Sequence, residues 1–584
     1  MSGVLDRPRL VFVLYVLATL VLCWPLSVQI GTHLPLSSTD LWLGVWDFWW
    51  WRRALFELGV SPYFTDHLFF PHGISLAFTD STLNVLATLP ISLVWGVEAA
   101  YDVALLAGFQ LAAFFAYLLV RHLVREPRAA FLVGLLYAFT PMHFEEALDH
   151  VNAASVQFAP LFVLCLLRTC HEGGRRNVLG LALAAAANAL VSWYWAALGA
   201  LVAGALALRE LLARDRARPA SHVVRDLAIA AGLAAALVLP FAWPMLRAIG
   251  EAYPFHGFGV DPAFWFVPSE HNPILGSLTQ GVREEHGLRL SVDHLPYLGF
   301  VPVALATLAA LRRSWGGERR GFWAGTAVAL LALAVGTPLT VFGQDLDGVW
   351  TPYAAFEHLP VLARLRTPSR FQLWAFVPLA VLCGGALAAI FRGPRPWLGW
   401  ALGAALLVEY LWLPFPTQPV AVHPYYRTLA RDPEAGALLP IPLPASNWDT
   451  RALHDQTVHG RPIVGGTGPY HPREALRELR ADPFLDGLAR NEPVAREPDV
   501  AALARLGIGT VVVHLDRSRS ASWALVAGPG DYYHRRAWWL SPGFPDEELV
   551  AIRRSLRRSL GAPLFRDERI EVFRVPLATA DGAR

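Results

Sequence analysis

The chain of 584 residues contains no lysine and few charged residues of any kind. Charged residues make up 16% of the sequence, whereas soluble domains average about 25%. Hydrophobic residues make up 54%, and the mean hydropathy is +0.38. This composition excludes an ordinary soluble domain and indicates a polytopic membrane protein. The formal net charge is only +2, so the overall charge does not indicate nucleic-acid binding.

Cysteine is also scarce. Its four residues lie in or at the ends of apolar stretches: Cys23, Cys165, Cys170 and Cys383. Their spacing excludes a disulfide framework and a CxxC metal pair. The sequence also lacks a P-loop, a GxGxxG turn, an HExxH motif and a GxSxG elbow. The first apolar run follows Arg7 and Arg9 and has no small-residue cleavage site, so we expect an uncleaved signal-anchor helix.

Apolar runs of membrane-spanning length are abundant. About eleven transmembrane helices are predicted on the rule of roughly 20 apolar residues for each crossing. The runs are 9–29, 99–120, 129–144, 153–170, 177–194, 196–213, 226–245, 296–311, 321–339, 371–391 and 397–414. A further apolar segment, 84–97, contains Asn84 and Pro90, is followed by Glu98, and is interpreted as a half-helix or re-entrant piece.

The placement of arginine predicts the topology. Short arginine-rich connections occur at 121–128, 171–176, 214–225, 312–320 and 392–395. The alternate connections, 30–83, 145–152, 246–295 and 340–370, are richer in acidic, histidine and aromatic residues. The positive-inside rule places the first set in the cytoplasm. We therefore expect a multi-pass protein of the bacterial cytoplasmic (inner) membrane with a cytoplasmic N terminus and everything after 414 outside.

Residues 415–584 have a different composition, with frequent proline and charge and no long apolar run. Residues 508–514 and 570–575 are predicted strands, and 473–480, 500–506 and 546–560 are predicted helices. The predicted fold is therefore an α-helical polytopic membrane domain, residues 1–414, followed by a small α/β extracytoplasmic domain, residues 415–584.

The first outer connection, 30–83, contains two carboxylates in a dense aromatic field. If 40–55 is helical, Asp40 and Asp47 share one face and lie roughly 10 Å apart along the axis. The tryptophans around them would hold this helix at the membrane surface. Asp40 is the leading catalytic candidate, as a general base toward an acceptor, and Asp47 is the second. The alternative for Asp40 is an N-cap role, and the alternative for the whole stretch is a solvated loop anchored by tryptophan.

A second polar cluster is predicted in the short connection 145–152. Its side chains could position an acceptor or bind a divalent metal with Asp40, Glu146 and His150 as the ligands to consider. Ordinary loop polarity is the alternative. The candidate substrate-binding residues are Glu145, Glu146, Asp149, His150 and Asn152.

Arginines at 364–370 form a third cluster, which the predicted topology places outside, against the positive-inside trend. Arg366 and Arg370 are therefore candidates for binding an anionic group such as a lipid phosphate. The alternative is simple contact with lipid headgroups. The long connection 246–295 could cover an active site, and His294 and Tyr297 are further substrate-binding candidates near its end.

Short motifs and the overall layout together carry a family resemblance. The motifs are Asp40–Trp51, Leu68-Phe69-Phe70-Pro71-His72-Gly73, His150-Val151-Asn152, Arg366-Thr367-Pro368-Ser369-Arg370-Phe371, His459-Gly460-Arg461-Pro462-Ile463 and Leu506-Gly507-Ile508. The chain resembles the GT-C superfamily of integral membrane glycosyltransferases, and locally it is similar to bacterial YfhO-type membrane proteins. The family often has two adjacent acids in the first loop, whereas this chain has the single Asp40 there.

The resemblance implies an inverting hexosyltransferase-type enzyme of the cell envelope. It would move a sugar from a polyprenyl-phosphate carrier to an extracytoplasmic lipid, glycan or protein, with Asp40 as the first-loop catalytic acid residue. A divalent cation, Mg²⁺ or Mn²⁺, is allowed but not required, and the oligomeric state is left open. Two other functions remain open: a transporter or lipid flippase, and a non-catalytic envelope assembly protein. Few ionisable residues lie inside the predicted spans, which argues against transport.

Overall fold

The computed structural model describes residues 2–36, 40–77, 79, 81–214, 217–248, 259–285, 296–317, 319–359, 365–443, 450–468, 472–490, 497–515 and 546–577. The chain divides into two units, which are described separately. The first unit contains residues 1–36, 80–247 and 254–418. The second contains mainly residues 37–79 and 419–584.

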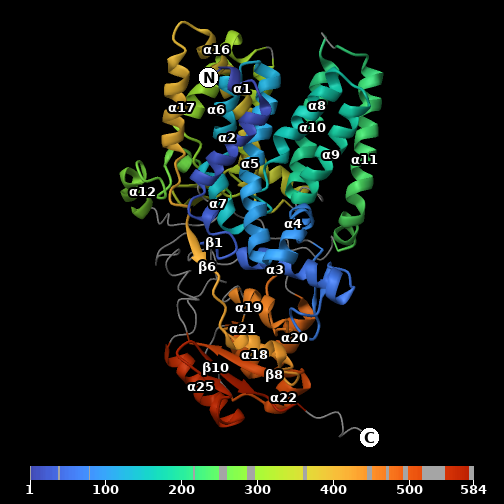
Figure 1. The fold of residues 1–584 in the computed structure, drawn as a ribbon, viewed down its shortest axis with the longest axis vertical. Helices are drawn as coiled ribbons and strands as arrows, with labels where there is room; N and C mark the ends of the chain where they lie inside the picture. Colours follow the sequence, from blue (N-terminus) through green and yellow to red (C-terminus); the bar gives the residue numbers. More distant parts are fainter. Residues whose placement is uncertain are drawn as a thin grey trace. The chain divides into compact units, whose positions relative to one another are not determined.

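The first unit is almost entirely helical (Figure 1). Its α-helices are α1 Ser2–Leu5, α2 Pro8–Leu22, α4 Thr82–Trp95, α5 Val97–Val124, α6 Pro127–Ala138, α7 Pro141–Asp149, α8 Phe158–His171, α9 Arg175–Val191, α10 Trp193–Leu212, α11 Ala220–Arg247, α12 Gln280–Glu285, α13 Phe300–Leu311, α14 Arg313–Gly316, α15 Arg320–Ala334, α16 Arg370–Arg392 and α17 Trp397–Glu409. Two small two-stranded sheets pair β1 His33–Pro35 with β6 Thr417–Pro419, and β4 Leu339–Val341 with β5 Gln344–Leu346.

Four of the described helices are long and apolar enough to cross a membrane: α5, α10, α11 and α16. Seven shorter apolar helices accompany them: α2, α4, α6, α8, α13, α15 and α17. A helix lies in each of the eleven predicted runs. The membrane character is thus confirmed by length and composition, while the count of eleven crossings stays a prediction.

The predicted arginine-rich connections all lie at junctions between helices and overlap the helix ends. Local capping explains one of the boundaries. Helix α5 ends at Val124, and the next residue, Arg125, has a left-handed backbone with φ of 52°. The next helix starts with Pro127 in its first turn, and the Glu126 side chain accepts a hydrogen bond from the backbone N–H of Arg128. Proline at the start and a carboxylate cap are the expected signals for a new helix.

The prediction of a loop at 145–152 was wrong for most of its length, because residues Pro141–Asp149 form helix α7. The predicted span 129–144 is broken after α6, where Thr140 caps α7 by accepting a bond from the N–H of His143. Pro141 follows as the first helical residue. A capping threonine followed by proline is a typical start of a helix, and the acidic residues lie within the new helix.

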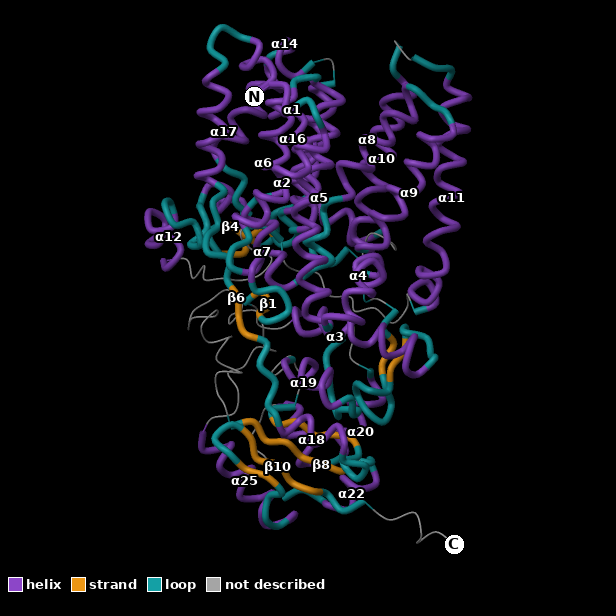
Figure 2. Tube along the Cα trace, viewed as in Figure 1, coloured by secondary structure: helices purple, strands orange, loops and turns teal. Residues whose placement is uncertain are grey.

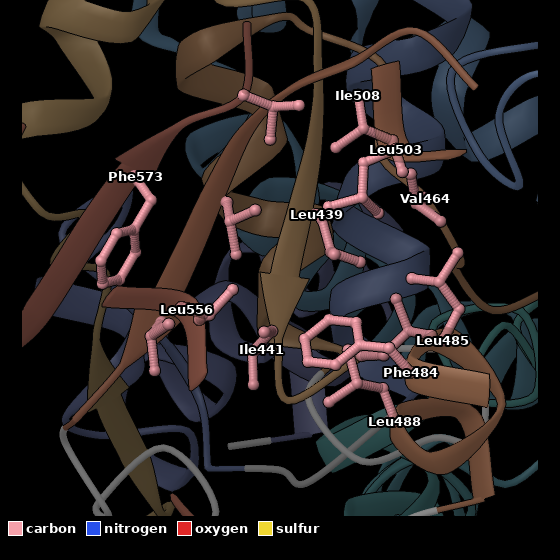
Figure 3. Packing of buried hydrophobic residues seen from close by; sticks show 14 of the residues in the cluster. Leu439, Ile441, Val464, Phe484, Leu485, Leu488, Leu503, Ile508, Leu556 and Phe573 are labelled. Carbon is pink, nitrogen blue, oxygen red and sulfur yellow. The ribbon is translucent and has the colours of Figure 1, made fainter. Parts of the chain in front are cut away.

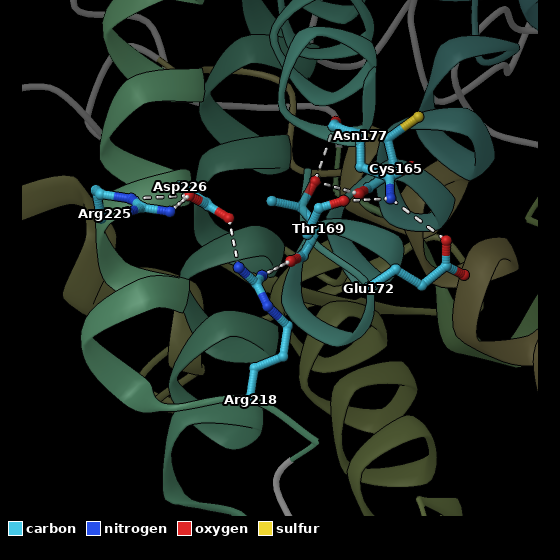
Figure 4. A network of polar contacts seen from close by, with 8 residues as sticks. Cys165, Thr169, Glu172, Asn177, Arg218, Arg225 and Asp226 are labelled. Atoms are coloured by element: carbon cyan, nitrogen blue, oxygen red, sulfur yellow. Dashed lines mark hydrogen bonds and ion pairs between the residues drawn. The ribbon is translucent and has the colours of Figure 1, made fainter. Parts of the chain in front are cut away.

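A polar network joins the ends of α8, α9 and α11 (Figure 4). Arg218 donates to the carbonyl of Thr169, in the last turn of α8, and to the Asp226 carboxylate, both at 2.6 Å. The Arg218 guanidinium also packs on Gly173, where an added Cβ would lie 2.2 Å from its central carbon. An arginine that bonds a free C-terminal carbonyl satisfies a group the helix itself cannot. Arg218 therefore links α8 to α11, and the Thr169 hydroxyl, which donates to the carbonyl of Asn177, links α8 to α9.

The second unit contains a four-stranded sheet in the order β7-β8-β10-β9 (Figure 2). Its strands are β7 Ala437–Ile441, β8 Ile508–His514, β9 Phe565–Arg566 and β10 Ile570–Arg574, and a separate pair joins β2 Phe64–Thr65 to β3 Ile74–Ser75. Strands β7 and β8 are parallel, and β10 is antiparallel to β8 and β9. Its helices are α3 Asp40–Arg52, the π-helix η2 Arg53–Leu58, α18 Tyr425–Arg431, α19 Arg451–His459, α20 Arg473–Ala481, α21 Pro483–Arg490, α22 Val500–Arg505 and α25 Asp546–Leu560.

One face of this sheet carries a hydrophobic core (Figure 3). Leu439 and Ile441 of β7 and Phe573 of β10 pack with Phe484 of α21 and Leu556 of α25, and all five are fully or almost fully buried. Each such side chain contributes about 1.5–3 kcal/mol relative to exposure. The predicted strands at 508–514 and 570–575, and the helices at 473–480, 500–506 and 546–560, are confirmed to within a residue or two.

The first outer connection belongs to the same unit as the C-terminal region, whereas the predicted domain boundary assigned it to the membrane domain. Backbone bonds join the two segments. Ile463 donates to the carbonyl of His67 at 2.9 Å, Phe69 donates to Gly465 at 2.7 Å, and Phe70 donates to Ile463 at 3.2 Å. Leu438 of β7 in turn donates to the carbonyl of Pro462 and accepts from the N–H of Val464, both at 2.9 Å. The connection thus extends the backbone pairing of the C-terminal sheet beyond its edge strand β7.

Candidate functional site

Asp40 and Asp47 lie on one helix, as predicted. Helix α3 begins at Asp40 and ends at Arg52. Asp40 is half-buried in the first turn, and Asp47 is 7% exposed in the middle of the helix. Residues 37–39, which precede Asp40 and bear on its alternative role as an N-cap, lie outside the described residues. The helix therefore holds one carboxylate near solvent and one in the interior.

The tryptophans of α3, which were predicted to hold the helix at the membrane surface, are instead buried within the protein. Trp46 and Trp50 stack with ring centres 5.6 Å apart, and both are almost completely buried. The Trp50 indole N–H donates to the carbonyl of Pro62 at 3.0 Å. Trp51 packs edge-on against Tyr63. The rings are part of the core of the second unit. A buried indole needs apolar packing around its ring and an acceptor for its N–H, and these contacts supply both.

Helix α19 of the C-terminal region packs against α3. Trp42 lies 5.1 Å from the ring of His454 and under the guanidinium of Arg451. The Trp46 indole N–H donates to Gln456 Oε1 at 2.7 Å. These contacts come from residues about 410 positions apart in the chain. They give the acid-bearing helix a rigid support.

Histidines surround this contact, and sequence reasoning did not select them as site residues. Burial lowers the pKa of His459 to about 3, and its Nδ1 accepts a bond from the N–H of Arg461. Burial also lowers the pKa of His67, although Asp66 opposes the effect. Both side chains are therefore neutral at physiological pH. The only signal in the sequence was that His459 and His67 stand in or beside the motifs that carry the family resemblance.

The second predicted cluster is gathered on α7 of the first unit. Glu145, Glu146 and Asp149 are each no more than 4% exposed. His150 Nδ1 lies 3.4 Å from a Glu146 oxygen, and Asn152 is half-buried in the turn that follows. The cluster exists as predicted, but it is internal to the helical unit instead of a solvated loop.

His143 is not available as a metal ligand. Its two ring nitrogens lie 2.6 Å and 2.7 Å from the carbonyl oxygens of Ala138 and Ala154. The ring also stacks on Phe109. Within the described ranges, no group of three His, Cys, Asp or Glu side chains has the geometry of a metal site.

The predicted arginine cluster separates into an exposed and a buried member. Arg366 is exposed, whereas Arg370, the first residue of α16, is 7% exposed. The Arg370 guanidinium stacks over Tyr194 at 4.5 Å. The Tyr194 hydroxyl donates to Thr367 Oγ1 at 3.3 Å. Stacking orients the plane of the guanidinium, which is the requirement for recognising a planar or tetrahedral anion.

The candidates from the long outer connection have mixed outcomes. His294 lies outside the described residues. Tyr297 is fully buried and packs edge-on against Tyr410, so it is part of the core of the helical unit. The neighbouring Glu409 accepts bonds from the N–H groups of Phe300 and Val301 and so caps α13.

Two buried acids inside predicted spans were missed. Asp102 of α5 is 0% exposed and accepts a bond from the N–H of Gly31 at 2.9 Å. Glu210 of α10 binds Arg319, Arg209 and His171 at 2.7–3.0 Å. Both acids stand in the sequence within runs assigned to the membrane, so a scan for single acids in those runs would have found them. The predicted site residues thus fall into two groups, with Asp40 and Asp47 in the second unit and all other described ones in the first.

Solved structures share this architecture. The structure of the arabinofuranosyltransferase AftD from Mycobacteria matches with a TM-score of 0.60 and 16% identity, over 98% of this chain and 40% of that chain. The oligosaccharyltransferase of Archaeoglobus fulgidus matches with a TM-score of 0.50 and 14% identity, over 89% of this chain and 70% of that chain. These matches show the fold alone: the helical chain shares the architecture of these two transferases.

The chain belongs to the family described as "Domain of unknown function (DUF6311)", whose model matches residues 10–411. None of the curated proteins compared with the chain matches it. The predicted GT-C resemblance is confirmed at the level of the fold, and the YfhO-type resemblance stays a prediction. The chain spans about two fifths of the length of the mycobacterial enzyme.

Proposed function

We propose that this protein is an inverting membrane glycosyltransferase that moves a sugar from a polyprenyl-phosphate carrier to an extracytoplasmic acceptor. The observation that carries the proposal is the construction of α3. Its two carboxylates share one face of a helix that follows the first apolar helix. Another face of the same helix contacts α19. The likeness of the fold to glycosyltransferases supports the same class.

The chemistry assigned to these residues is a single displacement. An acceptor hydroxyl attacks the anomeric carbon, its proton passes to the Asp40 carboxylate, and the bond from the anomeric carbon to the phosphate oxygen breaks. The polyprenyl phosphate leaves with the electron pair. One displacement inverts the anomeric centre, and a positioned carboxylate base contributes about 10²–10⁴-fold.

Other predicted residues take supporting roles in this proposal. Arg370 and Arg366 bind the donor phosphate, for which a guanidinium is well suited because it donates two parallel hydrogen bonds. The α7 carboxylates with His150 and Asn152 are assigned to acceptor binding, and Asp47 is assigned to assist Asp40 on α3. We propose that the transfer takes place on the extracytoplasmic face of the bacterial inner membrane.

The test is sugar transfer by the full chain in proteoliposomes, with a panel of polyprenyl-phosphate sugars as donors. Asp40→Asn should lower the transfer rate at least about 100-fold. Glu57→Gln is the matched control, because Glu57 is an exposed acid in the adjoining π-helix that pairs only across one helical turn with Arg53. An Asp40→Asn variant that transfers sugar at the wild-type rate would refute the assignment of the base.

Transport is the second candidate, and the buried Asp102 within α5 is the observation that favours it. A carboxylate inside a candidate membrane helix is a functional-site signal in transporters and flippases. Movement of a lipid-linked sugar across proteoliposomes without a covalent product, and its loss in Asp102→Asn, would establish this function instead.

A further inference from the structure

The contact between α3 and α19 centres on one buried amide, that of Gln456. Gln456 is 0% exposed. Its Oε1 accepts from the Trp46 indole N–H at 2.7 Å. Its Nε2 donates to the carbonyl of His67 at 2.7 Å and to that of Arg461 at 2.8 Å. Both amide protons and the oxygen are therefore engaged.

These three bonds connect segments that are far apart in the sequence. Trp46 lies on α3, His67 lies in the stretch that pairs with residue 463, and Arg461 follows α19. A side chain with one acceptor and two donors is required here, because the opposing groups are one N–H and two carbonyls. A carboxylate of the same length would face two carbonyl oxygens, and an apolar side chain would leave all three groups without a partner.

The geometry of α3 makes this amide relevant to the acids. Trp42 and Trp46 are four residues apart and form the face that contacts α19. Asp40 and Asp47 are seven residues apart and form a second face, roughly 130° around the axis at about 100° for each residue. The rotation of α3 about its own axis therefore decides the direction in which both carboxylates project.

We infer that Gln456 is a positioning residue, through which the C-terminal region sets the rotation of α3 and so the orientation of Asp40. This role rests on the proposed function for its catalytic consequence, while the mechanical part stands on the hydrogen bonds alone. In this role, the C-terminal region supports the acid-bearing helix α3 of the same molecule.

The experiment is hydrogen exchange of the full chain in nanodiscs, comparing Gln456→Leu with the control Thr457→Val. Thr457 is the next residue of α19, and its hydroxyl bonds only back to the carbonyl of His454. We expect the amides of 41–52 to exchange at least about tenfold faster in Gln456→Leu, with the amides of β8 unchanged. Wild-type exchange in 41–52 would overturn the inference, as would an equal increase in Thr457→Val or an equal increase throughout β8.

A double-mutant cycle tests the specific bond. Trp46→Phe removes the indole donor, so adding Gln456→Leu to it should increase exchange less than Gln456→Leu does alone. Full additivity would overturn the pairing. In the transfer assay, Gln456→Leu should lower kcat more than it raises KM, because the donor-binding residues are untouched, and a pure KM effect would contradict positioning. If the wild type transfers no sugar from any donor, the proposed function fails, and the exchange result still decides whether Gln456 holds α3.

Discussion

Replacing Glu571 should weaken the C-terminal sheet measurably. Glu571 lies on the central part of β10 and is 0% exposed. Its carboxylate accepts bonds from Arg553 at 2.6 Å and from Arg557 at 2.8 Å and 2.6 Å, both from α25. Removing one partner of a buried ion pair costs about 3–5 kcal/mol. Arg557 is 42% exposed and Arg553 is 20% exposed, so both side chains can turn toward water. We therefore expect the substitution to lower the free energy of unfolding by about 3 kcal/mol.

The assay is hydrogen exchange of β8 amides, which report the opening of the sheet. A loss of about 3 kcal/mol corresponds to exchange about 100-fold faster in Glu571→Leu. Glu497→Gln is the control, because Glu497 pairs with Arg558 at 3.3 Å and both side chains are more than half exposed. An exposed pair of this kind contributes about 0–1 kcal/mol. Equal effects of the two substitutions would refute the reasoning.

The same carboxylate gives a dependence on pH. Burial alone would raise the pKa of Glu571, but the bonds from Arg553 and Arg557 outweigh it and lower the pKa below the ordinary value of 4.5. The unfolded chain therefore binds the proton first as the pH falls. The stabilisation is fully present above pH 4.5 and is lost as the pH falls through the lower native pKa. Glu571→Leu should remove this part of the acid sensitivity, and an unchanged acid profile would contradict the assignment.

Two further perturbations test other parts of the structure. Gly173→Ala should lower the unfolding temperature of the helical unit more than Gly174→Ala does. Both glycines have positive φ, but only a Cβ at residue 173 would displace the Arg218 guanidinium. Equal shifts of the two variants in a thermal unfolding assay would contradict this. Lowering the pH from 7.5 to 5 should lower the protection factors of the α19 amides, measured after correction for the slower intrinsic exchange at low pH, because His459 with a native pKa of about 3 stays neutral while the unfolded histidine takes up a proton near 6.5. His459→Phe should reduce this pH dependence of protection in α19. An unchanged pH dependence would argue against a buried neutral histidine.

The comparison of prediction with structure shows where local patterns suffice. Helix 546–560 and strand 508–514 were predicted within a residue because their periodicity and flanking residues are local signals. The break between α6 and α7 was also visible in Thr140-Pro141, but the hydrophobicity of 129–144 took precedence in the prediction. The burial of the α3 tryptophans could not be predicted, because their partners lie about 400 residues further along the chain.

By itself, the sequence determined the membrane class, the positions of most helices and the presence of two acids on one face of a helix after the first apolar run. These depend on composition, on helical periodicity and on capping, all of which act over a few residues. Only the tertiary structure decided that the first outer connection and the C-terminal region form one unit, that the α7 acids are internal, and that Gln456 bonds to Trp46. Those features depend on contacts between distant segments, and a buried donor finds its acceptor only when the packed chain brings the two together.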